Sequence, residues 1–156
     1  MSAPPVWRGV RFLIPGLDVP EVESALGMPT GSGAIAGLTF TPRGGLAMGS
    51  DRACVRQALL LLLLTRPGER VMRPTYGCDL FKLIFWPNDD TTAGLAIHYV
   101  RQAVTRWEPR VDRVRVDAVR NPEDASKLDI FLEYRVRSTG DEDRLSVQVR
   151  LDGGAA

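Results

Sequence analysis

The chain has 156 residues, of which 44% are hydrophobic and 25% are charged, a composition typical of one soluble globular domain. Its 20 Lys and Arg balance 19 Asp and Glu to a net charge of +1, which excludes the basic field expected of a nucleic-acid-binding protein. The longest apolar run, Ala58 to Leu64, is far shorter than the roughly 20 residues of a membrane span. Cys54 and Cys78 lack the spacing of a metal site or a disulfide framework. We therefore expect a cytoplasmic protein with reduced thiols, without an export signal and without a cofactor.

The first 33 residues are predicted to form an N-terminal arm, followed by one domain at residues 34–152 and a flexible tail at 153–156. Five of the eleven prolines precede residue 34, and the apolar residues there have no clear period. Pro20 to Met28 is compatible with one short helix. In Ile35 to Met48, apolar residues alternate with threonines before a Pro-Arg-Gly-Gly turn, which predicts a strand or hairpin.

A first long helix is predicted from Ser50 or Asp51 to about Arg66. Leu60, Leu61 and Leu64 lie opposite its main apolar stripe, so the helix is apolar nearly all round. Each leucine left in water would forgo about 1.5 to 3 kcal/mol of burial free energy. Leu60 and Leu64 are therefore candidate partner contacts, with cover by the N-terminal arm as the alternative. The main stripe consists of Val55, Ala58, Leu59 and Leu62.

The segment from Thr65 to Pro87 begins with Pro67-Gly68, which ends the helix. Glu69, Arg70 and Arg73 then lie in a turn bounded by Pro74 and Gly77, and such a turn holds ion-pairing groups in one shape. These three charged residues are candidate partner contacts. A short connecting helix follows, predicted from the spacing of Leu80, Leu83 and Ile84 and from the pair Phe81 and Phe85.

A second long helix is predicted from Thr91 to Trp107, capped by one of the residues Asn88 to Asp90. Glu108-Pro109-Arg110 ends it, because proline fixes the exit direction of the chain. Three period-two segments follow, joined by short polar loops, and they predict an antiparallel meander. Their apolar positions are Val114, Val116 and Ala118; Leu128, Ile130, Leu132, Tyr134 and Val136; and Leu145, Val147, Val149 and Leu151.

The expected fold is α+β, with two main helices and the short connecting helix packed on one face of this three-stranded sheet. The last strand is expected at a sheet edge that is open to pairing with another chain. Phe131 falls on the otherwise polar side of the middle strand. It is a candidate contact, although single exposed aromatic residues are common on protein surfaces.

Two motifs in fixed order carry a resemblance to a known family. Pro67-Gly68-Glu69-Arg70, with Met72, Pro74, Gly77, Leu80 and Phe85, precedes Trp107-Glu108-Pro109-Arg110-Val111 and the three strands. From roughly Gly37 to Leu151 the chain resembles the small baseplate wedge proteins of contractile phage tails, type VI secretion baseplates and extracellular contractile injection systems. The arm before Gly33 departs from the short family core.

The resemblance implies a non-catalytic inner-baseplate subunit that joins the large wedge proteins and initiates sheath assembly by strand addition. Glu108, Pro109 and Arg110 would contribute to the wedge contact. Inner tube or hub proteins are further candidate partners, and we expect several copies, six in number, in a ring. The particle would form in the cytoplasm, and the kind of parent machine and its later release are left open.

Two other functions remain alternatives. Some members of the family carry a lysozyme-like description, but glycoside hydrolysis needs two facing carboxylates, one with a raised pKa. Glu69 and Glu108 each lie close to an arginine, which favours the ionised form. The lone His98 is more simply a packing or surface residue than a catalytic one. The fold is also similar to a bacterial anti-adaptor, which would make the chain a stand-alone regulatory binding protein.

Overall fold

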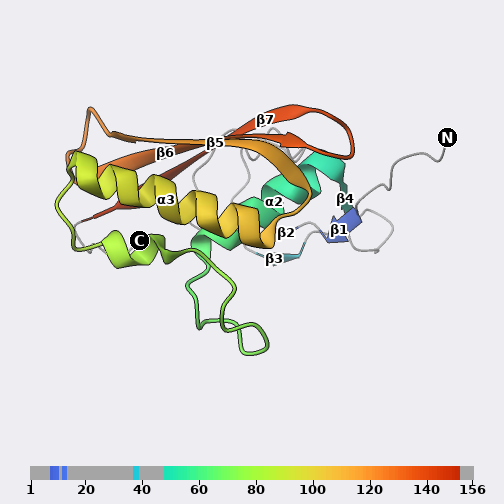
Figure 1. The fold of residues 1–156 in the computed structure, drawn as a ribbon. Helices are drawn as coiled ribbons and strands as arrows, with labels where there is room; N and C mark the ends of the chain where they lie inside the picture. The colour runs from blue at the N-terminus through green and yellow to red at the C-terminus, as the bar shows by residue number, and fades with distance from the viewer. Residues whose placement is uncertain (1–7, 11, 14–36, 39–47, 152–156) are drawn as a thin grey trace.

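The computed structural model describes residues 8–10, 12–13, 37–38 and 48–151 (Figure 1). Its main body contains helix α2 (Asp51–Leu64), the short 3-10 helix η1 (Asp79–Leu83), helix α3 (Asp90–Trp107) and three antiparallel strands. Both long helices lie on one face of the sheet (Figure 1). The α+β prediction is confirmed. The predicted helix at Pro20–Met28 and the tail at 153–156 lie outside the described residues.

The sheet is a meander of β5 (Val111–Arg120), β6 (Lys127–Val136) and β7 (Glu142–Arg150), with β6 in the middle. The predicted alternation is confirmed most clearly in β6, where each apolar residue of the inner face is at most 2% exposed. Early in β5 a bulge between Asp112 and Arg115 interrupts the register, and Arg113 has a φ of 50° there.

The helix boundaries follow local capping chemistry. The Asp89 carboxylate accepts a 2.7 Å hydrogen bond from the Thr92 N–H, which fixes the start of α3 one residue before the predicted position. Helix α2 ends at Leu64, two residues earlier than predicted, just ahead of Pro67. The short connecting helix is present, but the predicted pairing of Phe81 with Phe85 on it is wrong. The 3-10 helix ends at Leu83, which leaves Phe85 85% exposed.

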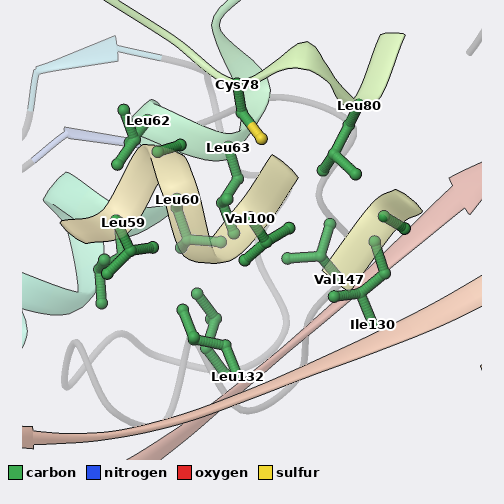
Figure 2. Close-up of a cluster of buried hydrophobic side chains, with 14 of the residues drawn as sticks. Leu59, Leu60, Leu62, Leu63, Cys78, Leu80, Val100, Ile130, Leu132 and Val147 are labelled. Atoms are coloured by element: carbon green, nitrogen blue, oxygen red, sulfur yellow. The ribbon is translucent and has the colours of Figure 1, made fainter. Parts of the chain in front are cut away.

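The core lies between the helices and the sheet, and α2 is buried on more than one side (Figure 2). Leu59, Leu60, Leu62 and Leu63 are all at most 2% exposed. Leu60 therefore packs inside the protein, and the expectation that a partner contacts it is wrong. Its burial needs no partner because α3 and the sheet surround this part of α2, as the labelled Val100 and Leu132 illustrate (Figure 2). Leu64 is half-buried.

Short strands from the N-terminal region pair with the segment before α2. Strand β1 (Arg8–Val10) pairs antiparallel with β4 (Met48–Ser50), and β2 (Phe12–Leu13) pairs antiparallel with β3 (Gly37–Leu38). Part of the predicted arm is thus hydrogen-bonded to its own chain, and one of these strands lies within the predicted hairpin region.

Candidate partner-binding surfaces

Residues 65–78 form a loop, here called the finger, that projects from the body between α2 and η1 (Figure 1). Backbone hydrogen bonds link its two limbs at the base, in the middle and at the tip. These run from Cys78 N–H to the Thr65 carbonyl (2.9 Å), from Gly68 N–H to Pro74 (2.7 Å) and from Arg73 N–H to Arg70 (3.1 Å). These hydrogen bonds hold the finger in one shape, as the prolines and glycines of this segment predicted.

Gly77 fixes the base of the finger. Its φ of +131° is a conformation that L side chains rarely adopt, and a Cβ placed there would lie 2.4 Å from the Thr65 carbonyl oxygen. The two limbs can approach this closely only because residue 77 has no side chain. Gly68, at φ +98°, permits the turn that follows Pro67.

The three charged residues predicted in this segment lie on the exposed finger. The Glu69 carboxylate accepts a 2.9 Å hydrogen bond from the Arg66 N–H, so part of its role is to cap the turn. The Arg70 guanidinium lies 4.3 Å from the centre of the Tyr76 ring. Their role in partner binding stays a prediction.

Sequence reasoning named Met72 only as part of the family motif and did not single out the tip of the finger as a contact. Val71 and Met72 are the central residues of the turn that the Arg70–Arg73 hydrogen bond closes, and they are 93% and 91% exposed. The available signal was an apolar pair enclosed by charged residues inside a turn-rich segment.

At the junction between α3 and β5, Glu108 and Arg110 bind each other. Arg110 Nε and Nη2 each donate a 2.6 Å hydrogen bond to one Glu108 carboxylate oxygen, and Nη1 lies 3.6 Å from Cys54 Sγ on α2. Glu108 is buried, Arg110 is partly buried and Pro109 is exposed. The hydrogen bond to Glu108 raises the pKa of Arg110, against the opposing effect of burial.

The Glu-Pro-Arg motif therefore joins α2, α3 and the sheet inside the protein. The Arg110 carbonyl also accepts a 2.9 Å hydrogen bond from the Arg137 N–H, which ties the start of β5 to the end of β6. Tyr76, in the finger, packs edge-to-face on Trp107 at 5.4 Å between ring centres. The two predicted motifs are thus connected by packing, which sequence spacing alone did not indicate.

A buried polar cluster, also missed in the sequence, joins α2 to β7. Asp143 accepts hydrogen bonds from Arg52 (2.6 Å), Arg56 (3.2 Å) and the Tyr134 hydroxyl (2.8 Å). Burial opposes ionisation of Asp143, but the hydrogen bonds from Arg52 and Tyr134 and the charge of Arg56 outweigh it and lower the pKa of this carboxyl. The four residues come from α2, β6 and β7, so no local pattern could reveal them.

Among the described residues the outer side of β7 is an unpaired sheet edge, and Arg56 covers one end of it. The Arg144 carbonyl accepts a 2.7 Å hydrogen bond from Arg56, so it points away from β6. Because backbone groups alternate in direction along an antiparallel strand, Ser146 and Gln148 also direct their N–H and C=O groups outward. In the part of the chain that the structure describes, no strand pairs with β7 on that side.

Phe131 lies half-exposed on the sheet face that is opposite the helices. The Arg144 guanidinium is 4.6 Å from its ring centre, across the β6–β7 pair. On the same face, Arg135 makes two hydrogen bonds, of 2.8 and 2.9 Å, to the Asp112 carboxylate. Intrachain contacts account for the position of Phe131, and its role as a partner contact stays a prediction.

Other candidate chemistry is sparse among the described residues. They hold no group of three or more His, Cys, Asp or Glu side chains suited to a metal ion. Both cysteines are free, and burial raises the pKa of Cys78 to about 11, which disfavours its thiolate. His98 is exposed on α3. No helix within the described ranges has both the length and the hydrophobicity of a membrane span.

These features define a small α+β domain with a rigid projecting finger, an ion-paired junction and an open sheet edge. Residues 49–141 match the family described as baseplate wedge protein gp25, and the chain belongs to that family. The predicted resemblance is confirmed. The baseplate wedge protein gp25 of Enterobacteria phage T4 is 32% identical over 65 residues, which are 42% of this chain and 49% of that protein. The match thus spans about half of the phage relative.

Solved structures share the fold. A protein from Geobacter sulfurreducens described as a "putative tail lysozyme" is 34% identical, with a TM-score of 0.62 over 69% of this chain and 96% of that one. A chain of the anti-feeding prophage baseplate is 27% identical, with a TM-score of 0.60 over 67% of this chain and 83% of that one. A chain of a type VI secretion baseplate, 18% identical with a TM-score of 0.53, covers 64% of this chain and 92% of its own length, and is similar in fold alone.

Proposed function

We propose that this protein is a non-catalytic structural subunit of the baseplate of a contractile injection machine. In this proposal it binds the large wedge proteins and provides the platform on which the sheath begins to assemble. Membership of the gp25 family supports the baseplate part. The particle would form in the cytoplasm, with several copies of the chain, six in number, arranged in a ring.

The observation that carries the sheath part is the open side of β7. Ser146 and Gln148 direct backbone donors and acceptors outward, and an edge of this kind pairs with an added strand. Arg56 already binds the Arg144 carbonyl, so an added strand would find this end of the edge occupied. We expect the first sheath ring to supply the added strand beside Ser146 and Gln148.

The wedge contact is expected at the Glu-Pro-Arg junction, but with different roles for its three residues. Glu108 is 6% exposed and is bound by Arg110, so its role is to hold the junction. Pro109 and the exposed part of Arg110 are the groups that a wedge protein would contact. Glu69, Arg70, Arg73, Leu64 and Phe131 remain further candidate contacts.

Proline at position 148 tests the strand addition. Gln148→Pro removes an N–H that points away from β6, so the internal ladder keeps its hydrogen bonds and the melting temperature should stay close to that of wild type. Particles with assembled sheath should become rare. The matched control Gln148→Ala keeps the N–H and should assemble normally. Normal sheath assembly by a folded Gln148→Pro protein would contradict strand addition at this edge.

The hydrolase alternative, suggested by the description of the Geobacter sulfurreducens relative, lacks a suitable carboxylate pair among the described residues near the motifs. Glu108 is held by Arg110, Glu69 caps the finger turn, and Asp79 lies 3.1 Å from the Lys82 ammonium. Purified protein should release nothing from peptidoglycan. Cleavage that is lost in Glu69→Gln or Glu108→Gln would establish the hydrolase instead. Recovery with one soluble regulator and no baseplate proteins would favour the regulatory alternative.

A further inference from the structure

The tip of the finger exposes two neighbouring apolar side chains at the point farthest from its base. Val71 is 93% exposed and Met72 is 91% exposed, the highest values among the large hydrophobic residues that the structure describes. Burying a side chain of either type on a partner is favourable. Neither contributes to the core, so the fold itself gives no reason for an apolar residue at either position.

The finger is also organised in advance for binding. Three backbone hydrogen bonds, between residues 65 and 78, 68 and 74, and 70 and 73, fix both limbs and the tip turn. The Arg66 guanidinium lies 4.1 Å from the centre of the Phe81 ring in η1, and Tyr76 packs on Trp107 of α3, so both limbs are anchored to the body. Within the finger, Arg70 stacks on Tyr76. A loop already held in its bound shape loses little conformational entropy when it docks.

The charge around the tip indicates the chemistry of the partner. Arg70 and Arg73 flank the tip and are both exposed, and residues 66–75 as a whole, with Arg66 and Glu69 nearer the base, carry +3 − 1 = +2. Arginines around an apolar tip match carboxylates around an apolar pocket, because arginine pairs with carboxylates in directed geometry. We propose that the finger inserts Val71 and Met72 into an apolar pocket rimmed by acidic residues on another protein subunit of the baseplate.

This inference rests on the proposed baseplate function and names a second contact of that assembly, separate from the β7 edge and the Glu-Pro-Arg junction. A protein pocket fits better than a lipid surface. The finger tip presents two apolar side chains, and the chain as a whole has a net charge of +1, whereas stable membrane binding needs a larger apolar area or a basic patch.

Competition for places in the assembled particle tests the inference. The full-length Val71→Ser/Met72→Ser protein and the wild type, distinguished by mass labels, are expressed together with the other particle proteins, and their ratio in purified particles is measured. Because both side chains are exposed, the double variant should melt like wild type. We expect it to be depleted about tenfold or more in particles. The control Phe85→Ser changes an 85% exposed side chain outside the finger and should be incorporated at its input ratio.

Two further measurements examine the pocket and its rim. Oxidation of Met72 by hydrogen peroxide, followed by mass spectrometry, should be at least about tenfold slower in particles than in the isolated protein. Arg73→Glu should also be depleted from particles, because it places a carboxylate against the acidic rim.

Each outcome decides the inference. Equal incorporation of the double variant, or equal oxidation of Met72 in both states, overturns the docked finger while leaving the baseplate function intact. Normal incorporation of Arg73→Glu overturns the acidic rim. Sedimentation of wild type, but not of the double variant, with vesicles of phosphatidylethanolamine and phosphatidylglycerol assigns the tip to a membrane instead. Absence of the wild-type chain from particles removes both the inference and the proposed function.

Discussion

Replacing Arg110 with alanine removes the hydrogen-bond donors that bind the buried carboxylate of Glu108. Glu108 is 6% exposed and both of its oxygens accept hydrogen bonds from Arg110, whose side chain is 20% exposed. Removing one partner of a fully buried pair costs roughly 3 to 5 kcal/mol. Because water reaches part of the Arg110 side chain, we expect a smaller loss of about 2 to 3 kcal/mol.

Urea denaturation at pH 7, followed by circular dichroism, measures this loss. For a chain of this size it corresponds to a fall of roughly 5 to 10 °C in melting temperature. The double variant Glu108→Gln/Arg110→Ala should be more stable than Arg110→Ala, because it leaves no charge without a partner. Arg101→Ala, at an exposed position on α3, is the control and should stay within about 0.5 kcal/mol of wild type. An Arg110→Ala protein as stable as that control would refute the structural role of the pair.

The result also decides how assembly data should be interpreted. If Arg110→Ala lowers both stability and particle number, the loss of particles does not establish a direct wedge contact. Pro109→Ala changes the exposed residue of the motif, so it separates contact from folding. A stable Pro109→Ala protein that fails to enter particles would support the wedge contact.

Three further predictions concern the base of the finger, the buried acid and the buried thiol. Gly77→Ala should destabilise the protein by about 2 kcal/mol or more in thermal melts, because its Cβ would meet the Thr65 carbonyl. Gly94→Ala, with nothing within 4 Å of the new Cβ, should instead stabilise α3 by about 0.5 to 1 kcal/mol. The lowered pKa of Asp143 contributes stability above the ordinary aspartate pKa of about 3.9 and loses it as pH falls through the folded pKa. The difference between wild type and Asp143→Asn in urea melts should therefore shrink on acidification, and a constant difference would contradict this. The pKa of Cys78, raised to about 11, favours folding below the ordinary thiol pKa, and this contribution is lost as pH rises toward 11. At pH 8, in a Cys54→Ser background, the Cys78 thiol should react with Ellman's reagent only on unfolding, and its rapid reaction in the native protein would refute its burial.

The sequence by itself determined the elements that depend on short-range pattern. Period-two alternation located β5, β6 and β7, and the cap candidates Asn88 to Asp90 with the stop at Pro109 bounded α3 within one residue. The turn chemistry of Pro67, Gly68 and Gly77 predicted a rigid segment, because proline and glycine restrict or extend the backbone wherever they occur.

Only the tertiary structure decided which of these residues are buried inside the protein and which are exposed. An all-apolar helix shows that several sides are buried but not by what, so either a partner or the N-terminal arm was expected to cover Leu60, which lies in the core and is 2% exposed. Neighbouring charges likewise do not show whether they bind each other, and Glu108 with Arg110 does so inside the protein.

Long-range contacts were beyond any local pattern. The cluster of Arg52, Arg56, Tyr134 and Asp143 joins residues up to 91 positions apart, and its members become neighbours only when α2 packs beside β7. The exposure of Val71 and Met72 has the same origin. A turn in the sequence does not tell how far it projects, because that depends on how α2 and η1 pack at its base and where the finger leaves the body.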